Sequence, residues 1–67
     1  MAELGNRLRE AREAKGWTQA QLAERIGVSR KTINTVENRV FVPSTVVALK
    51  LALALGARVE TLFFLDE

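Results

Sequence analysis

Four side chains in one short stretch have the chemistry to read the edges of base pairs. They are Arg30, Lys31, Asn34 and Thr35. Arginine and lysine donate hydrogen bonds to guanine, and asparagine and threonine also bond to base edges in the major groove. If Ile33 and Val36 point into a core, helical spacing puts all four on the outward face, with no acidic residue among them. We therefore predict that these four residues contact bases.

Two short helices joined by a glycine-centred turn are predicted to position them. Thr18 is a good N-cap, and Gln21 three residues later completes a capping box, so one helix begins near residue 19. Gly27 can adopt the positive φ that ends this helix, and Ser29 can cap the next one. The unit spans about residues 18–38 and has the layout of a helix-turn-helix, which places its second helix in the major groove.

Composition restricts the chemistry of the chain. The 67 residues include no cysteine, histidine or tyrosine, which excludes disulfides, Cys/His metal sites and the usual nucleophile–base pairs. We therefore expect no enzyme, no metal, no cofactor and no evident small-molecule ligand. The longest apolar stretch, around residues 46–55, is interrupted by Lys50 and falls short of the roughly 20 residues that span a bilayer. The expected location is the cytoplasm, with no membrane partner.

Charge is unevenly distributed along the chain. Of the net +2, residues 17–43 carry four basic and two acidic groups, whereas residues 44–67 carry two basic and three acidic groups. The positive excess therefore coincides with the predicted reading unit, which favours a polyanionic partner at that end of the molecule.

A first helix is predicted over about residues 4–15. Leu4, Leu8 and Ala11 form one apolar stripe, and Gly16 supplies the C-terminal stop. With this helix, the two helices of the reading unit and two more in the C-terminal half, the sequence predicts an all-α, compact five-helix fold. For the C-terminal residues, the alternative to helix is a short extended tail. The whole chain, residues 1–67, is expected to be a single domain.

The C-terminal half begins with an extended linker. Pro43 disfavours helix in the residue before it, so residues 39–43 should be extended. One or more of its apolar side chains should fold over the core: Val40, Phe41 and Val42. Ser44 can cap a helix over residues 45–55, and a short fifth helix should cover residues 59–63.

Apolar side chains in the C-terminal half exceed what a small core can bury. The helix over residues 45–55 is apolar on more than one face, and three large apolar residues follow each other near the chain end. A second copy of the chain is the simplest cover for them, through a region of about residues 44–67. The predicted dimer interface comprises Leu49, Leu53, Phe63, Phe64 and Leu65.

The capping residues, turn glycines and apolar spacings described above occur in two segments. These are LREAREAKGWTQAQLAERIGVSRKTINTVEN and, after it, VPSTVVALKLALALGARVETLF. This pattern resembles the phage-repressor and Cro-type (XRE) family of helix-turn-helix regulators over nearly the whole chain. It is closest to compact stand-alone repressors of the lambda-repressor-like fold, many of which are dimers.

The resemblance implies further roles for individual residues. It implies contacts to DNA phosphates from Gln19, Ser29, Thr32, Asn38 and Arg39. It also implies a buried ion pair between Arg12 and Glu37, which ties the first helix to the third. Two positions depart from the family pattern. Arg39 replaces a common glycine, so the turn is expected either to take a different backbone shape or to strain a non-glycine residue. Arg58 replaces a capping residue before the last helix.

The expected function is sequence-specific binding of duplex DNA by a homodimer at a palindromic operator, with repression of transcription. Two alternatives retain DNA binding: the antitoxin of a toxin pair, or the DNA-binding module of a larger sensor protein. A third alternative, from another class, is a protein-interaction adaptor that has lost DNA binding.

Overall fold

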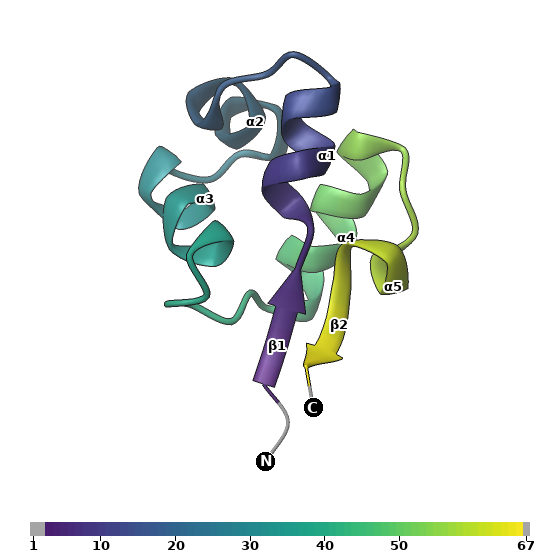
Figure 1. Ribbon diagram of the computed structural model, residues 1–67. Helices are drawn as coiled ribbons and strands as arrows, with labels where there is room; N and C mark the ends of the chain where they lie inside the picture. Colours follow the sequence, from purple (N-terminus) through teal and green to yellow (C-terminus); the bar gives the residue numbers. More distant parts are fainter. Residues whose placement is uncertain (1–2, 67) are drawn as a thin grey trace.

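Five helices and two short strands make up residues 3–66, the part of the chain that the computed structural model describes (Figure 1). In chain order they are β1 (Glu3–Asn6), α1 (Leu8–Ala14), α2 (Gln19–Ile26), α3 (Arg30–Glu37), α4 (Thr45–Leu55), α5 (Val59–Leu62) and β2 (Phe63–Asp66). In Figure 1, α2 and α3 lie on one side of α1, while α4 and α5 lie on the other. The two strands extend from the bottom of the helical part.

The helices of the reading unit begin and end at the predicted residues. Thr18 Oγ1 accepts from the Gln21 amide at 3.1 Å, and Gln21 Oε1 accepts from the Thr18 amide at 2.8 Å, which completes the capping box. Gly27 ends α2 with φ of 74°. Ser29 Oγ accepts from the Thr32 amide at 3.2 Å and so caps α3. These local signals fix the turn between the helices, and the helix-turn-helix prediction is confirmed.

The predicted bounds of α4 are also confirmed. Ser44 Oγ accepts from the Val47 amide at 3.2 Å, and Gly56 ends the helix with φ of 63°. Arg58 precedes α5 without a side-chain cap, as its residue type indicated. No helix formed by residues 3–66 has the length and apolar character needed to cross a lipid bilayer.

One apolar core joins all five helices. Its buried members are Leu8, Leu22, Ala23, Ile26, Ile33, Val36, Leu51, Ala52, Leu55, Leu62 and Phe63. Ile33 and Val36 are the buried residues of α3, and both were predicted to point inward. Burial of this face holds α3 against the scaffold and leaves its opposite face to solvent.

The N-terminal segment differs from the prediction. The first helix begins at Leu8 rather than near residue 4, and β1 pairs antiparallel with β2, with Gly5 opposite Phe64. A Cβ atom on Gly5 would lie 2.4 Å from the Phe64 ring, so the ring can occupy this position over β1 because residue 5 is glycine. Asn6 Oδ1 accepts from the Leu8 amide at 3.1 Å where the helix begins. The fold is therefore a five-helix domain with a two-stranded ribbon, and the all-α prediction is incomplete.

The chain end is extended, which agrees with the predicted alternative of a short C-terminal tail. Phe63 was expected in the last helix and at a partner surface, but it begins β2 and is only 7% exposed. It packs mainly in the core of its own chain, and its assignment to the dimer interface stays a prediction. Phe64 is half-buried, and the Arg7 guanidinium lies 5.0 Å from the centre of its ring. Leu65 remains exposed.

The expectation for the linker side chains is wrong. Val40, Phe41 and Val42 are all exposed, Val40 by 77%. The Thr35 carbonyl oxygen accepts from the amides of Val40 at 2.9 Å and Phe41 at 3.2 Å. These bonds fold the main chain back onto the end of α3, and the linker therefore follows the helix without turning its side chains into the core.

Candidate nucleic-acid interface

The outward face of α3 carries the four predicted base-reading residues. Arg30, Lys31 and Asn34 are exposed, and Thr35 is half-buried. The Thr35 hydroxyl donates to a main-chain oxygen of its own helix, with Lys31 O at 2.9 Å and Thr32 O at 3.0 Å. Its proton is therefore already used, and Thr35 offers a partner only a lone pair or its methyl group. The structure thus brings three exposed polar side chains and one partly covered hydroxyl to the same surface.

Two predicted phosphate ligands lie together at the start of α3. The hydroxyl oxygens of Ser29 and Thr32 are 3.0 Å apart, and Ser29 is exposed while Thr32 is half-buried. This pair lies at the same end of the helix as Arg30 and Lys31. An anion at this end would meet two hydroxyl groups and the positive end of the helix dipole.

Glu37 connects three helices through its carboxylate, and its side chain is fully buried. Arg12 donates from Nε to Oε2 at 2.7 Å and from Nη2 to Oε1 at 3.3 Å. Arg9 and Gln19 donate to Oε1 at 3.4 and 3.0 Å. Arg12, whose side chain is 10% exposed, also donates to the Trp17 carbonyl oxygen at 2.8 Å. The carboxylate thereby fixes α3 relative to α1 and to the start of α2.

The surroundings of Glu37 favour its ionised form. Burial alone raises the pKa of the carboxyl, but hydrogen bonds from Arg12 and Gln19 and the Arg12 charge outweigh burial, so the pKa lies below its ordinary value. The hydrogen bond to Glu37 raises the pKa of Arg12 against the opposing effect of burial. Both members of the pair are therefore charged at neutral pH.

We predict that acid destabilises the fold through protonation of Glu37. Because the pKa of Glu37 is lower in the folded protein than its ordinary value of 4.5, its contribution to stability is complete above that pH. The contribution is lost as the pH falls from there through the folded pKa. Thermal melts from about pH 6 down to about pH 2 should show a smaller drop in Tm for Glu37→Gln than for the parent.

Glu60 serves as an internal reference for this comparison. Its pKa is lowered by a hydrogen bond with its own main chain and by the Arg58 charge. Because Glu60 titrates in the parent and in the variant alike, its effect cancels in the difference between the two profiles. Parallel profiles for the two proteins would contradict a role for Glu37 in the acid response.

The side chain of Gln19 is turned toward the protein. It is half-buried, and Nε2 lies 3.0 Å from Glu37 Oε1 and 3.2 Å from Asn34 Oδ1. Asn38 is turned back onto its own helix, where Nδ2 donates to Asn34 O at 2.9 Å and to Asn34 Oδ1 at 3.2 Å. Both amide nitrogens, which a phosphate would need as donors, are therefore engaged within the chain. The Asn34 to Asn38 spacing of one helical turn was the available sequence signal for the second contact.

Arg39 is also engaged. It is the one non-glycine residue with positive φ in the described part of the chain, at 61°, which agrees with the expected alternative of a strained non-glycine residue. Its Nη1 lies 2.8 Å from Asp66 Oδ2, and both side chains are partly exposed. An ion pair this exposed contributes roughly 0–1 kcal/mol. A phosphate could therefore displace Asp66 at small cost.

Comparisons with known proteins agree with this geometry. The helix-turn-helix family profile matches residues 8–62. An uncharacterised HTH-type transcriptional regulator of Methanothermobacter thermautotrophicus is 46% identical over 61 residues, covering 90% of this chain and 88% of that protein. The uncharacterised HTH-type transcriptional regulator YgzD of Bacillus subtilis is 37% identical over 62 residues, covering 92% and 94%.

A solved structure extends the likeness to three dimensions. The restriction-modification controller protein C.AhdI from Aeromonas hydrophila matches with a TM-score of 0.78 and 42% identity, covering 82% of this chain and 83% of that chain. The chain belongs to the XRE-type helix-turn-helix family of DNA-binding transcriptional regulators, which are not enzymes.

Proposed function

We propose that this protein recognises a specific duplex DNA sequence as a homodimer and represses transcription at that site. The observation that carries the proposal is the exposed face of α3, where Arg30, Lys31 and Asn34 stand opposite a fully buried apolar face. A helix of this kind fits the major groove, and its cationic residues match the acceptors of guanine. Each half-site is therefore expected to contain at least one G·C pair.

Contacts to phosphate would position α3 without reading sequence. Ser29 and Thr32 are the best placed, because they lie at the helix start beside the basic residues. Gln19, Asn38 and Arg39 are secondary, since each must share or exchange a partner that it already has within the chain. We expect replacement of Ser29, Thr32 or Arg39 to weaken binding to all sequences to a similar degree.

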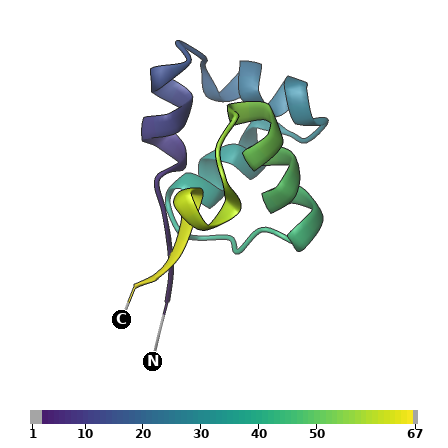
Figure 2. The same ribbon diagram turned by 90° about the vertical axis from the view of Figure 1, so that its right-hand side faces the viewer.

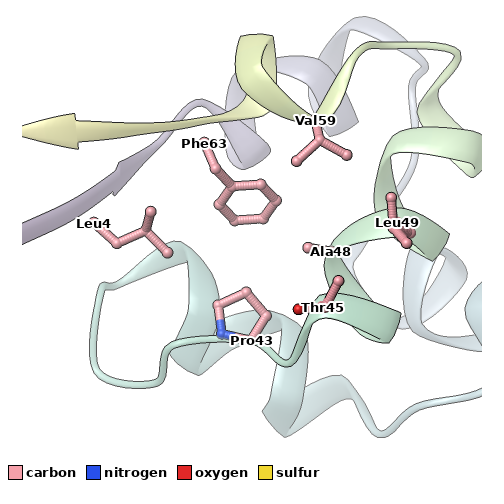
Figure 3. A pocket seen from close by; sticks show the side chains of 7 residues that line it. All are labelled: Leu4, Pro43, Thr45, Ala48, Leu49, Val59 and Phe63. Atoms are coloured by element: carbon pink, nitrogen blue, oxygen red, sulfur yellow. The ribbon is translucent and has the colours of Figure 1, made fainter.

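The exposed apolar surface supports the homodimer. On α4, Val46, Leu49 and Leu53 repeat at helical spacing along one face, and Leu49 and Leu53 are 55% and 85% exposed. Leu49 also borders an apolar hollow of about 220 Å³ that includes Leu4 and the ring of Phe63 (Figure 3). A second copy would remove this surface from water. Two copies would also present two reading helices, which suits half-sites about 34 Å apart.

The direct test is selection of bound sequences from a random duplex pool, together with sedimentation at micromolar concentration. We expect a palindromic site, a dimer, and affinity that falls steeply with salt. Leu53→Glu should yield a folded monomer, whereas Ala14→Glu, an exposed change on α1, should leave the dimer intact. A monomer that selects no palindrome would overturn the dimer. Absent or salt-insensitive binding would favour the adaptor alternative, and a co-purifying toxin would favour the antitoxin alternative.

A further inference from the structure

The buried carboxylate of Glu37 determines which way the Gln19 amide points. An ionised carboxylate only accepts hydrogen bonds, and Glu37 Oε1 lies 3.0 Å from the amide of Gln19. If the amide were turned over, two oxygen atoms would face each other at that distance. The nitrogen of Gln19 must therefore face Glu37, and this orientation follows from the chemistry of the partner.

The orientation of Asn34 follows from its two neighbours. The Gln19 nitrogen lies 3.2 Å from the Asn34 side-chain oxygen, so its second hydrogen points to Asn34. The Asn38 nitrogen is fixed by the Asn34 carbonyl oxygen at 2.9 Å, and it also lies 3.2 Å from the side-chain oxygen. Two donors of fixed direction thus face the Asn34 amide, which must meet them with its oxygen.

This arrangement leaves the Asn34 nitrogen on the solvent side. Asn34 is exposed on the outward face of α3, and within residues 3–66 no group accepts a hydrogen bond from its Nδ2. An asparagine that is free to use both ends of its amide pairs with adenine, accepting from N6 and donating to N7. Here the accepting end is already occupied by Gln19 and Asn38. Only the donating end remains for a ligand.

We propose that Asn34 acts as a donor-only reader and selects guanine rather than adenine, an inference that rests on the proposed DNA binding. Guanine presents two neighbouring acceptors in the major groove, O6 and N7. Adenine presents one acceptor beside the N6 donor, thymine presents one acceptor, O4, beside its methyl group, and cytosine presents the N4 donor, so guanine alone offers two acceptors. Hydrogen bonds link the Glu37 carboxylate to Gln19 and Gln19 to Asn34. Through them the buried carboxylate determines which base Asn34 prefers. Glu37 and Gln19 are positioning residues in this scheme, since they act through Asn34.

The Asn34→Ala variant first identifies the position in the selected duplex at which discrimination between base pairs is lost. Binding of the parent and of each variant is then compared for duplexes that carry each of the four base pairs at that position. The parent should prefer guanine over adenine by about tenfold, which corresponds to the loss of one good contact. Asn34→Asp keeps an oxygen toward Gln19 and Asn38 but turns an acceptor outward, so its preference should move to cytosine. The ratio between base pairs is the readout, because the added negative charge weakens binding to every duplex.

Gln19→Ala tests the positioning step. It removes one of the two fixed donors, so the Asn34 amide can turn and the guanine-to-adenine ratio should fall toward one. Gln21→Ala is the matched control, because Gln21 is an exposed amide of the same helix without contact to Asn34, and it should retain the parent ratio. Circular dichroism verifies that each variant is folded.

The outcomes separate this inference from the proposed function. A parent protein that prefers adenine at this position, or an Asn34→Ala variant that loses discrimination nowhere, would overturn the inference while DNA binding stands. A parent protein without any sequence-dependent binding would overturn the proposed function itself.

Discussion

Replacement of Glu37 by alanine should destabilise the fold by about 3–5 kcal/mol, because it strands the Arg12 charge in a site where that side chain is 10% exposed. A chain of 67 residues has roughly 3–10 kcal/mol of total stability. The variant should therefore be largely unfolded near room temperature or melt far below the parent. Urea unfolding and thermal melts followed by circular dichroism measure the difference.

Two controls isolate the buried charge as the cause. Arg9→Ala removes a donor to the same carboxylate, but the Arg9 side chain is 52% exposed, so the loss should stay within about 1 kcal/mol. A double variant with Arg12→Met and Glu37→Leu should recover much of the lost stability, because it removes both charges together. A Glu37→Ala protein that melts with the parent would show that the pair contributes little.

Substitution of the two leading basic residues of α3 should have the largest effect on DNA binding. Arg30→Ala and Lys31→Ala are each expected to lose roughly 1–3 kcal/mol at the selected site and to relax specificity at one base pair. The physical reason is the loss of hydrogen-bond donors to guanine O6 and N7. Titration of labelled duplexes at fixed salt concentration, with the four base pairs compared at each position, gives both quantities.

Lys50→Ala is the matched control for charge. Lys50 is exposed on α4, so the variant removes one positive charge away from α3. The variant should weaken binding to all sequences slightly and leave the order of preferred bases unchanged. If the Arg30 and Lys31 variants bind every sequence as the parent does, the two residues do not read bases.

The sequence predicted the helices best where the signals are local. The capping box of Thr18 and Gln21, the cap at Ser44 and the glycines at 27 and 56 fix helix ends within a few residues of chain. The N-terminal strand was missed because its partner is β2 at the other end of the chain. Leu4 also continues the apolar stripe of α1 by coincidence of spacing, so the helical interpretation had no local contradiction.

In the candidate site too, local features were predicted and contacts between different elements were not. Helical periodicity was sufficient to place Arg30, Lys31 and Asn34 on the outward face of α3. It was not sufficient to show that the Gln19 amide is shared between Glu37 and Asn34, since these partners lie on another helix. The engagement of Arg39 by Asp66 likewise depends on the extended chain end, which brings an acidic residue beside the linker.

The ribbon of β1 and β2 has a consequence for the order of folding. Glu3 pairs with Asp66, and all five helices lie between the two strands in the chain (Figures 1 and 2). The ring of Phe64 reaches Gly5 only when the two strands have paired. Because pairing of such distant segments has a higher entropy cost than formation of the helices, we expect the ribbon to close late during folding and to open early during unfolding.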